Sequence, residues 1–120
     1  MITSKHFKEV EFNRLTPSCS LQDMEQSTMD MLDKAREIAG IPFVLNCAKR
    51  TREWDLAKGR SGNSAHTEGK AVDIACRNSS TRHVIVDALL KAGFNRIGIA
   101  KTFVHADNST KLPQRVIFLY

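Results

Sequence analysis

Apolar residues recur along the chain with two different spacings, and these spacings predict both helices and strands. Residues 21–39 carry an apolar stripe at helical spacing, so we expect a long helix that Ser20 caps and Gly40 ends. A second helix is expected over residues 81–92, with Gly93 at its C-terminus. These two segments are the main helices of the predicted fold.

Shorter apolar or alternating runs predict strands at residues 43–46, 70–75, 96–100 and 103–107. A short helix capped by Thr51 and a polar, glycine-containing loop at residues 58–63 lie between the first two strands. The order of these elements predicts an α+β fold, with a small and largely antiparallel sheet packed with two main helices. With 120 residues and a hydrophobic fraction of 42%, the chain is expected to form one domain over residues 1–120.

The strand at residues 70–75 divides its side chains between two faces. Val72 and Ile74 point one way and belong in a core, whereas Asp73 points the other way between two alanines. Gly69 permits a tight turn just before this strand, and that turn can bring His66 back toward Asp73. One uncovered carboxylate and a histidine are therefore expected to meet.

A second histidine completes a set of possible metal ligands. His105 shares one face of its strand with Asp107, and a cross-strand pairing of His105 with Asp73 would form a triangle with His66. Two histidines and one carboxylate leave a fourth position for water, as in catalytic zinc sites. Taken alone, His66 could be a surface loop residue and His105 a strand histidine with satisfied hydrogen bonds, but the joint pattern favours a metal site.

Five segments carry a resemblance to a known family. The motif S-x-H-x-x-G-x-A-x-D runs from Ser64 to Asp73 and is followed by His105 inside a strand. Matching segments elsewhere are Phe7 with Glu11 and Phe12, residues 46–51, residues 93–99 and the closing residues 116–120. Together these residues resemble the M15 peptidases, zinc D,D-carboxypeptidases and endopeptidases that cut bacterial peptidoglycan peptides. The chain is most similar to the short, single-domain branch that is common among phage endolysins.

The resemblance implies a fold shared with the Hedgehog signalling domain and one zinc ion held by His66, Asp73 and His105. It also implies that Arg50 binds the substrate carbonyl or carboxylate and stabilises the oxyanion, although an exposed surface arginine is the alternative. Ser64 would bond the substrate backbone or fix the ligand loop, or be a plain loop serine. The implied substrates are peptidoglycan stem peptides or cross-bridges, and the expected state is a monomer.

The identity of the catalytic base is open, because this chain departs from the family pattern. Better-studied members have an acid or a histidine three residues before the last ligand, where this chain has Thr102. Thr102 cannot act as a base near neutral pH. Asp107 could be the base, but support of a zinc-binding histidine is the favoured role, and Glu68 is the other acid near the site.

Three rival functions remain open at this point. They are a metal-binding but inactive module of the same fold that binds a wall peptide or protein, a non-haem iron enzyme, and a basic nucleic-acid-binding domain. The net charge of +5 suits an anionic wall, nucleic acid or a solvated surface without a specific partner. No nucleic-acid motif or aromatic interleaving accompanies it.

The cysteines, the apolar runs and the first residues indicate where the protein is made and where it would act. Three cysteines without C-x-x-C spacing argue against a disulfide framework. No apolar run is long enough to insert into a membrane, and the first residues lack the apolar region of a signal peptide. We therefore expect cytoplasmic synthesis, with action on the bacterial cell wall if the protein is released.

Overall fold

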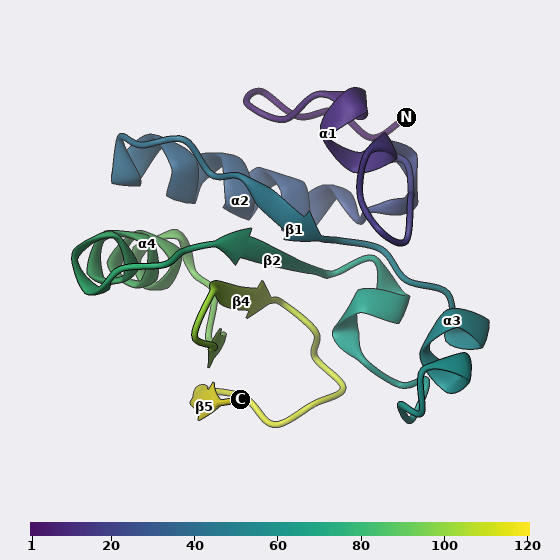
Figure 1. Cartoon of the computed structure of the whole chain (residues 1–120). Helices are drawn as coiled ribbons and strands as arrows, with labels where there is room; N and C mark the ends of the chain where they lie inside the picture. The colour runs from purple at the N-terminus through teal and green to yellow at the C-terminus, as the bar shows by residue number, and fades with distance from the viewer.

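The computed structural model describes all residues from 1 to 120 (Figure 1). Its helices are α1 (Glu9–Asn13), α2 (Gln26–Ala39), α3 (Arg52–Ala57) and α4 (Ser79–Ala92), and its two 3₁₀ turns are η1 (Leu21–Asp23) and η2 (Ala65–Glu68). Its strands are β1 (Leu45–Cys47), β2 (Ala71–Ala75), β3 (Arg96–Ile99), β4 (Phe103–Asp107) and β5 (Val116–Leu119).

The five strands form one sheet in the order β1-β2-β4-β3-β5. All neighbouring strands are antiparallel except β3 and β5, which run parallel. In Figure 1 the sheet runs from β1 to β5 at the C-terminal end. The α+β prediction, with two main helices and a largely antiparallel sheet, is confirmed.

The core lies between the two main helices and one face of the sheet. Helices α2 and α4 pack against each other, and Leu32 and Leu89 from them are fully buried. Val72 and Ile74 of β2 join the same cluster, together with Val104 of β4. Because strand side chains alternate, the intervening residues of β2 and β4 lie on the opposite face, free of this core.

The long helix begins later than the sequence indicated. Ser20 caps η1, its side chain accepting a hydrogen bond from Gln22, and the chain then becomes extended at Met24. Helix α2 starts at Gln26, after the N–H of Glu25 has bonded to the carbonyl of Gly69 at 2.9 Å. This tertiary bond to the loop before β2 interrupts what the apolar spacing alone describes as one helix.

The other predicted helix starts earlier than expected, because Asn78 caps α4 by accepting from the N–H of Thr81. Thr51 does cap α3, through the N–H of Trp54. None of the helices combines the length and apolar character needed to cross a bilayer.

Candidate metal site and cleft

One row of side chains crosses all five strands on the face opposite the helices. The register aligns Cys47 of β1 with Asp73, Asp73 with His105 of β4, His105 with Gly98 of β3, and Gly98 with Phe118 of β5. The predicted cross-strand pairing of Asp73 with His105 is therefore confirmed. The next row aligns Asp107 with Arg96.

Gly98 is the small member of this row, and its lack of a side chain has a structural reason. A Cβ at this position would lie 2.5 Å from the ring of Phe118. The glycine lets Phe118 pack over the sheet, with its ring centroid 5.5 Å from that of His105. The aromatic end of β5 thereby covers one side of His105.

His66 reaches the row from η2. Gly69 ends this turn with a φ of +73°, and a Cβ there would collide with the backbone carbonyl of Asp23. The Nδ1 of His66 lies 2.6 Å from the carbonyl oxygen of Ala48, which can only accept a hydrogen bond. Nδ1 must therefore carry the proton, and Nε2 faces Asp73 Oδ1 at 3.3 Å.

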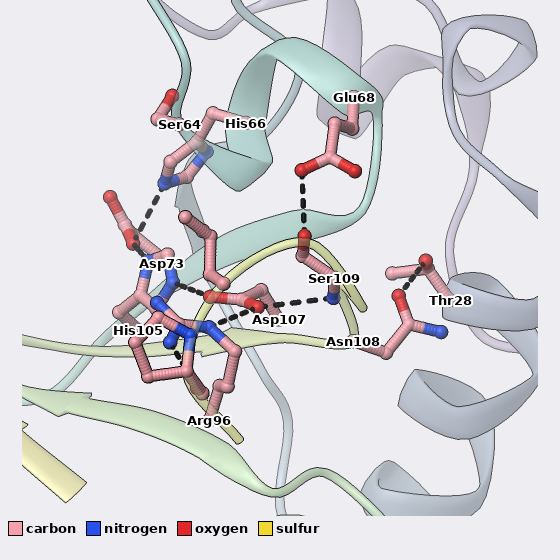
Figure 2. Close-up of polar contacts among 12 residues, drawn as sticks. Thr28, Ser64, His66, Glu68, Asp73, Arg96, His105, Asp107, Asn108 and Ser109 are labelled. Atoms are coloured by element: carbon pink, nitrogen blue, oxygen red, sulfur yellow. Dashed lines mark hydrogen bonds and ion pairs between the residues drawn. The ribbon is translucent and has the colours of Figure 1, made fainter. Parts of the chain in front are cut away.

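His105 is held from its other side by Asp107 (Figure 2). Its Nδ1 lies 2.9 Å from Asp73 Oδ1, and its Nε2 lies 2.6 Å from Asp107 Oδ2. Asp107 is itself fully buried, and its other oxygen accepts bonds from Arg96 Nε at 2.8 Å and from the N–H of Ser109 at 3.1 Å. The two histidines thus converge on one oxygen of Asp73.

The pKa values of the cluster follow from burial and from these contacts. Burial acts to raise the pKa of Asp73, but hydrogen bonds and charges from His105 and His66 outweigh it and hold the pKa well below its usual range. Burial acts to lower the pKa of His105, but hydrogen bonds to Asp107 and Asp73 dominate and leave the pKa raised. In the metal-free protein, His105 therefore tends to hold a proton between two carboxylates.

Cys47 is a further neighbour with a possible ligand atom. One donor atom each from Cys47, His66 and Asp73 lie within 4.8 Å of one another, and all three residues are buried. Burial, with a smaller effect of Asp73, raises the pKa of the Cys47 thiol to about 11. Its sulfur lies 3.9 Å from His66 Nδ1.

Arg50 is half of a buried pair beside the cluster and is not a free surface residue. Its Nε lies 2.8 Å from Asp55 Oδ1, an ion pair whose orientation falls short of a hydrogen bond. Ser64 Oγ donates to Asp55 Oδ2 at 2.9 Å and accepts from Arg50 at 3.4 Å. Ser64 therefore connects the turn that carries His66 to Arg50 and Asp55.

A cleft of about 340 Å³ opens over this face of the sheet. Its lining residues are Thr16, Pro17, Cys47, Arg50, Trp54, Lys58, Arg60, Asp73, Phe103 and Tyr120. Burial, and then the charge of Asp73, raise the pKa of Tyr120, so its hydroxyl remains protonated and can donate a hydrogen bond. The cleft thus places the Cys47 thiol and the Asp73 carboxylate together with cations and aromatic rings around one space.

The two acids named as possible bases do not line this cleft. Asp107 lies beneath His105, and Glu68 Oε2 accepts a bond from Ser109 Oγ at 2.8 Å. In Figure 2 Glu68 points toward Ser109, whereas His66 points toward Asp73. Thr102 is exposed in the link between β3 and β4 and also does not line the cleft.

Sequence reasoning missed two charged residues that position the others, Asp55 beside Arg50 and Arg96 beside Asp107. Arg96 had a usable signal, because the predicted hairpin of residues 96–100 and 103–107 aligns position 96 with position 107. Asp55 had none, since its pairing with Arg50 depends on how α3 turns back on the end of β1.

A match to a known protein family covers the residues of this site. The sequence profile of the peptidase M15 family matches residues 5–107, which is most of the chain. That range includes His66, Asp73, His105 and Asp107. No curated protein sequence matches the chain.

Proposed function

Since the chain belongs to the peptidase M15 family, we propose that it is a zinc-dependent peptidase that hydrolyses peptide bonds of bacterial peptidoglycan. It would act on stem peptides or cross-bridges as a D,D-carboxypeptidase or endopeptidase of the endolysin type. The observation that carries the proposal is the convergence of His66 Nε2 and His105 Nδ1 on one oxygen of buried Asp73.

One of the two donor distances to Asp73 has the spacing of a zinc site, and the other is shorter. Metal–ligand bonds of about 2.0–2.2 Å in a tetrahedral site place neighbouring donor atoms roughly 3.3–3.5 Å apart. The distances from Asp73 Oδ1 to the two imidazole nitrogens are 3.3 and 2.9 Å. Both rings also have their remaining nitrogen bonded to an acceptor, Ala48 for His66 and Asp107 for His105, as zinc-binding histidines do.

Cys47 and His105 are both candidates for the third ligand. One donor atom each of Cys47, His66 and Asp73 lie within 4.8 Å of one another, whereas His105 faces the same oxygen of Asp73 as His66 does. The nitrogen of His66 that contacts Cys47 Sγ, at 3.9 Å, is Nδ1, which is bonded to Ala48 and is not available to a metal. The available nitrogen of His66 faces Asp73, and the available nitrogen of His105 faces the same oxygen. We therefore assign the metal to His66, Asp73 and His105, with Cys47 as a neighbouring thiol.

A zinc ion in this position would polarise a scissile carbonyl and lower the pKa of a bound water toward neutrality. Arg50 lines the same cleft and would stabilise negative charge on the carbonyl oxygen through its guanidinium. Asp55 and Ser64 would hold that guanidinium in place, because both contact it inside the fold. Asp107 would fix the ring of His105 through Nε2–H.

One observation favours a second candidate, an inactive metal-binding module of the same fold. Asp73 is the only carboxylate among the residues that line the cleft, and it is assigned to the metal. No lining side chain is then an evident base near neutral pH. Such a module would bind a wall peptide or a protein partner without cutting it.

Zinc analysis and peptidoglycan digestion test the proposal together. Purified protein should hold about one zinc per chain, and His66→Ala and His105→Ala should lose most of it. Mass spectrometry of purified peptidoglycan should show released peptides with the zinc-loaded protein and none after chelation. Cys47→Ser is the matched control and should keep its zinc.

The outcomes separate the alternatives. Zinc loss in Cys47→Ser equal to that in His105→Ala would reassign the ligands to Cys47, His66 and Asp73. Zinc at full occupancy without any released peptide would favour the inactive module. Unchanged zinc content in both histidine variants would contradict the metal site itself.

A further inference from the structure

A second pocket, of about 650 Å³, shares no lining residue with the cleft over the metal site. Its walls are the link from β1 into α3, the η2 turn with the residues on either side of it, and single residues from the segment before α2 and the loop after β4. No hydrophobic side chain lines it, so a ligand that fills the pocket must be polar. The lining residues are Glu25, Lys49, Thr51, Arg52, Gly62, Asn63, Thr67, Glu68, Lys70 and Lys111.

Positive charge exceeds negative charge in this pocket. Its charged lining residues are Lys49, Arg52, Lys70, Lys111, Glu25 and Glu68. One ion pair forms among them, between Lys70 Nζ and Glu68 Oε1 at 3.8 Å. Three cations and the carboxylate of Glu25 are left without an ion-pair partner, so the lining carries a net charge of +2. An anion is therefore the ligand that this charge favours.

The structure holds two of these cations at the pocket wall. Lys49 Nζ donates a hydrogen bond to the carbonyl of Thr67 at 2.9 Å, and Arg52 Nη1 donates to Asn63 Oδ1 at 3.0 Å. A Cβ at Gly62 would lie 3.2 Å from Arg52 Nη1, so the glycine lets the loop close around the guanidinium. Both acceptors are neutral, so the two side chains are fixed while their charge stays uncompensated. Each cation also keeps further N–H groups for a ligand.

These donors suit a phosphate group with hydroxyl groups beside it. Ammonium and guanidinium groups both bind phosphate, the first as a point charge and the second as a planar fork. The Thr51 hydroxyl accepts from the N–H of Trp54 at 3.0 Å and keeps its own proton to donate. The volume also lies within the range of roughly 300–1,000 Å³ of small-molecule sites, which leaves room for more than the phosphate itself.

The same lining argues against nucleic acid as the source of the phosphate. Sites for single strands stack the bases on aromatic side chains, and no aromatic residue lines this pocket. A polyol has hydroxyl groups in place of bases, and its hydroxyls match the hydroxyl and amide groups of Thr51 and Asn63.

We propose that this pocket binds a phosphate group carried on a polyol, with Lys49 and Arg52 as its main contacts and exposed Lys111 as a further one. The inference goes beyond the proposed function, because it needs neither a metal nor a scissile peptide bond. A polymer of polyol phosphate would hold the protein on an anionic surface while the cleft over the metal site stays open, since the two sites share no residue.

Fluorescence anisotropy of a labelled glycerol phosphate oligomer tests the proposal. Lys49→Gln with Arg52→Gln should weaken binding about tenfold, a loss of about 1.4 kcal/mol. The matched control, Lys34→Gln with Arg77→Gln, removes the same two kinds of cation from exposed positions outside the pocket and should weaken binding much less. Lys111→Gln disturbs none of the hydrogen bonds that hold Lys49 and Arg52, so it tests the pocket without risk to the fold and should weaken binding by a smaller factor.

Competition distinguishes the sources of the phosphate. Unlabelled glycerol phosphate should displace the oligomer, inorganic phosphate should do so only at higher concentration, and glycerol should not displace it. A single-stranded DNA oligonucleotide of the same charge should bind wild type less tightly and should respond alike to the pocket variant and the control variant.

Four results would overturn the proposal. Two are the absence of oligomer binding by wild type, and equal losses in the pocket and control variants, which would assign binding to net charge. Tighter binding of DNA that the pocket variant abolishes would assign the pocket to nucleic acid. Inorganic phosphate that competes as well as glycerol phosphate would assign it to free phosphate. Peptide hydrolysis enters none of these outcomes, so they are independent of the peptidase assignment.

Discussion

Asp107 has no exposed surface, and both of its oxygens accept hydrogen bonds, which limits what the side chain is able to do. Oδ2 accepts from His105 Nε2, and Oδ1 accepts from Arg96 and from the N–H of Ser109. A general base must reach the proton that it removes, directly or through one water. Asp107 lies behind His105, so its contacts suit the orientation of that ring.

Replacing Asp107 with asparagine should weaken zinc binding with little direct effect on turnover. The amide keeps the shape but loses the charge that makes His105 a strong ligand, so zinc affinity should fall by about 10–100-fold. Activity should recover in excess zinc, measured by competition with a chromogenic chelator and by peptide release. Glu68→Gln is the control, because Glu68 faces Ser109 and its loss should leave zinc affinity unchanged.

A different pattern would assign Asp107 the role of base. Zinc affinity would then persist in Asp107→Asn while turnover fell by roughly 10²–10⁴, and added zinc would not restore it.

Individual residues were predictable where a motif and an alternating strand acted together. His66, Asp73 and His105 belong to such a pattern, and the register brings them to one place. Asp55 and Cys47 were not assigned because their roles depend on contacts between β1, α3 and η2. Such contacts do not follow from the direction of a single strand or from the start of a single helix.

At the scale of elements, the sheet was more predictable than the starts of the helices. Alternation along a strand fixes its two faces, and a short link between two strands fixes which positions pair. The β3–β4 hairpin therefore aligns Arg96 with Asp107 and Gly98 with His105. The start of α2 depends instead on Glu25 bonding to Gly69, a residue more than forty positions later.

This contact between Gly69 and the segment before α2 yields a prediction about the ligand loop. Gly69→Ala adds a Cβ that meets the carbonyl of Asp23 and also occupies a left-handed conformation. Gly40→Ala is a matched control, because Gly40 has a φ of +67° but open space around its missing side chain. The control should lose about 1–2 kcal/mol of unfolding free energy from backbone strain alone.

Gly69→Ala should lose clearly more than Gly40→Ala in urea unfolding, and it alone should weaken zinc binding, since η2 carries His66. Equal losses in the two variants would mean that the segment at Asp23 moves aside freely. Zinc affinity that stays at the wild-type level in Gly69→Ala would show that His66 does not depend on this packing.

For the whole molecule, the two faces of the sheet separate folding from chemistry. One face packs against α2 and α4, while the other carries buried charged groups that contact one another. We therefore expect that removing a proton or adding a metal on the second face changes the free energy of unfolding while the core keeps its packing.

The pH dependence of zinc stabilisation follows from His105. Its folded pKa is raised above the ordinary value of about 6.5, so in the metal-free protein it contributes stability that is fully present below that value. That contribution is lost as pH rises through the folded pKa. Zinc requires the deprotonated ring, so it competes with this proton and binds more tightly at higher pH.

The rise in melting temperature on adding zinc should therefore be small near pH 5.5 and should grow toward pH 8. A ligand at about 100 times its Kd stabilises the folded state by about 2.7 kcal/mol, so the effect is measurable by differential scanning fluorimetry. His105→Gln is the control, because the titrating ligand is gone and the zinc-dependent rise should be lost at every pH. A zinc-dependent rise in wild type that is equal at pH 5.5 and pH 8 would contradict a metal site in which His105 exchanges its proton for zinc.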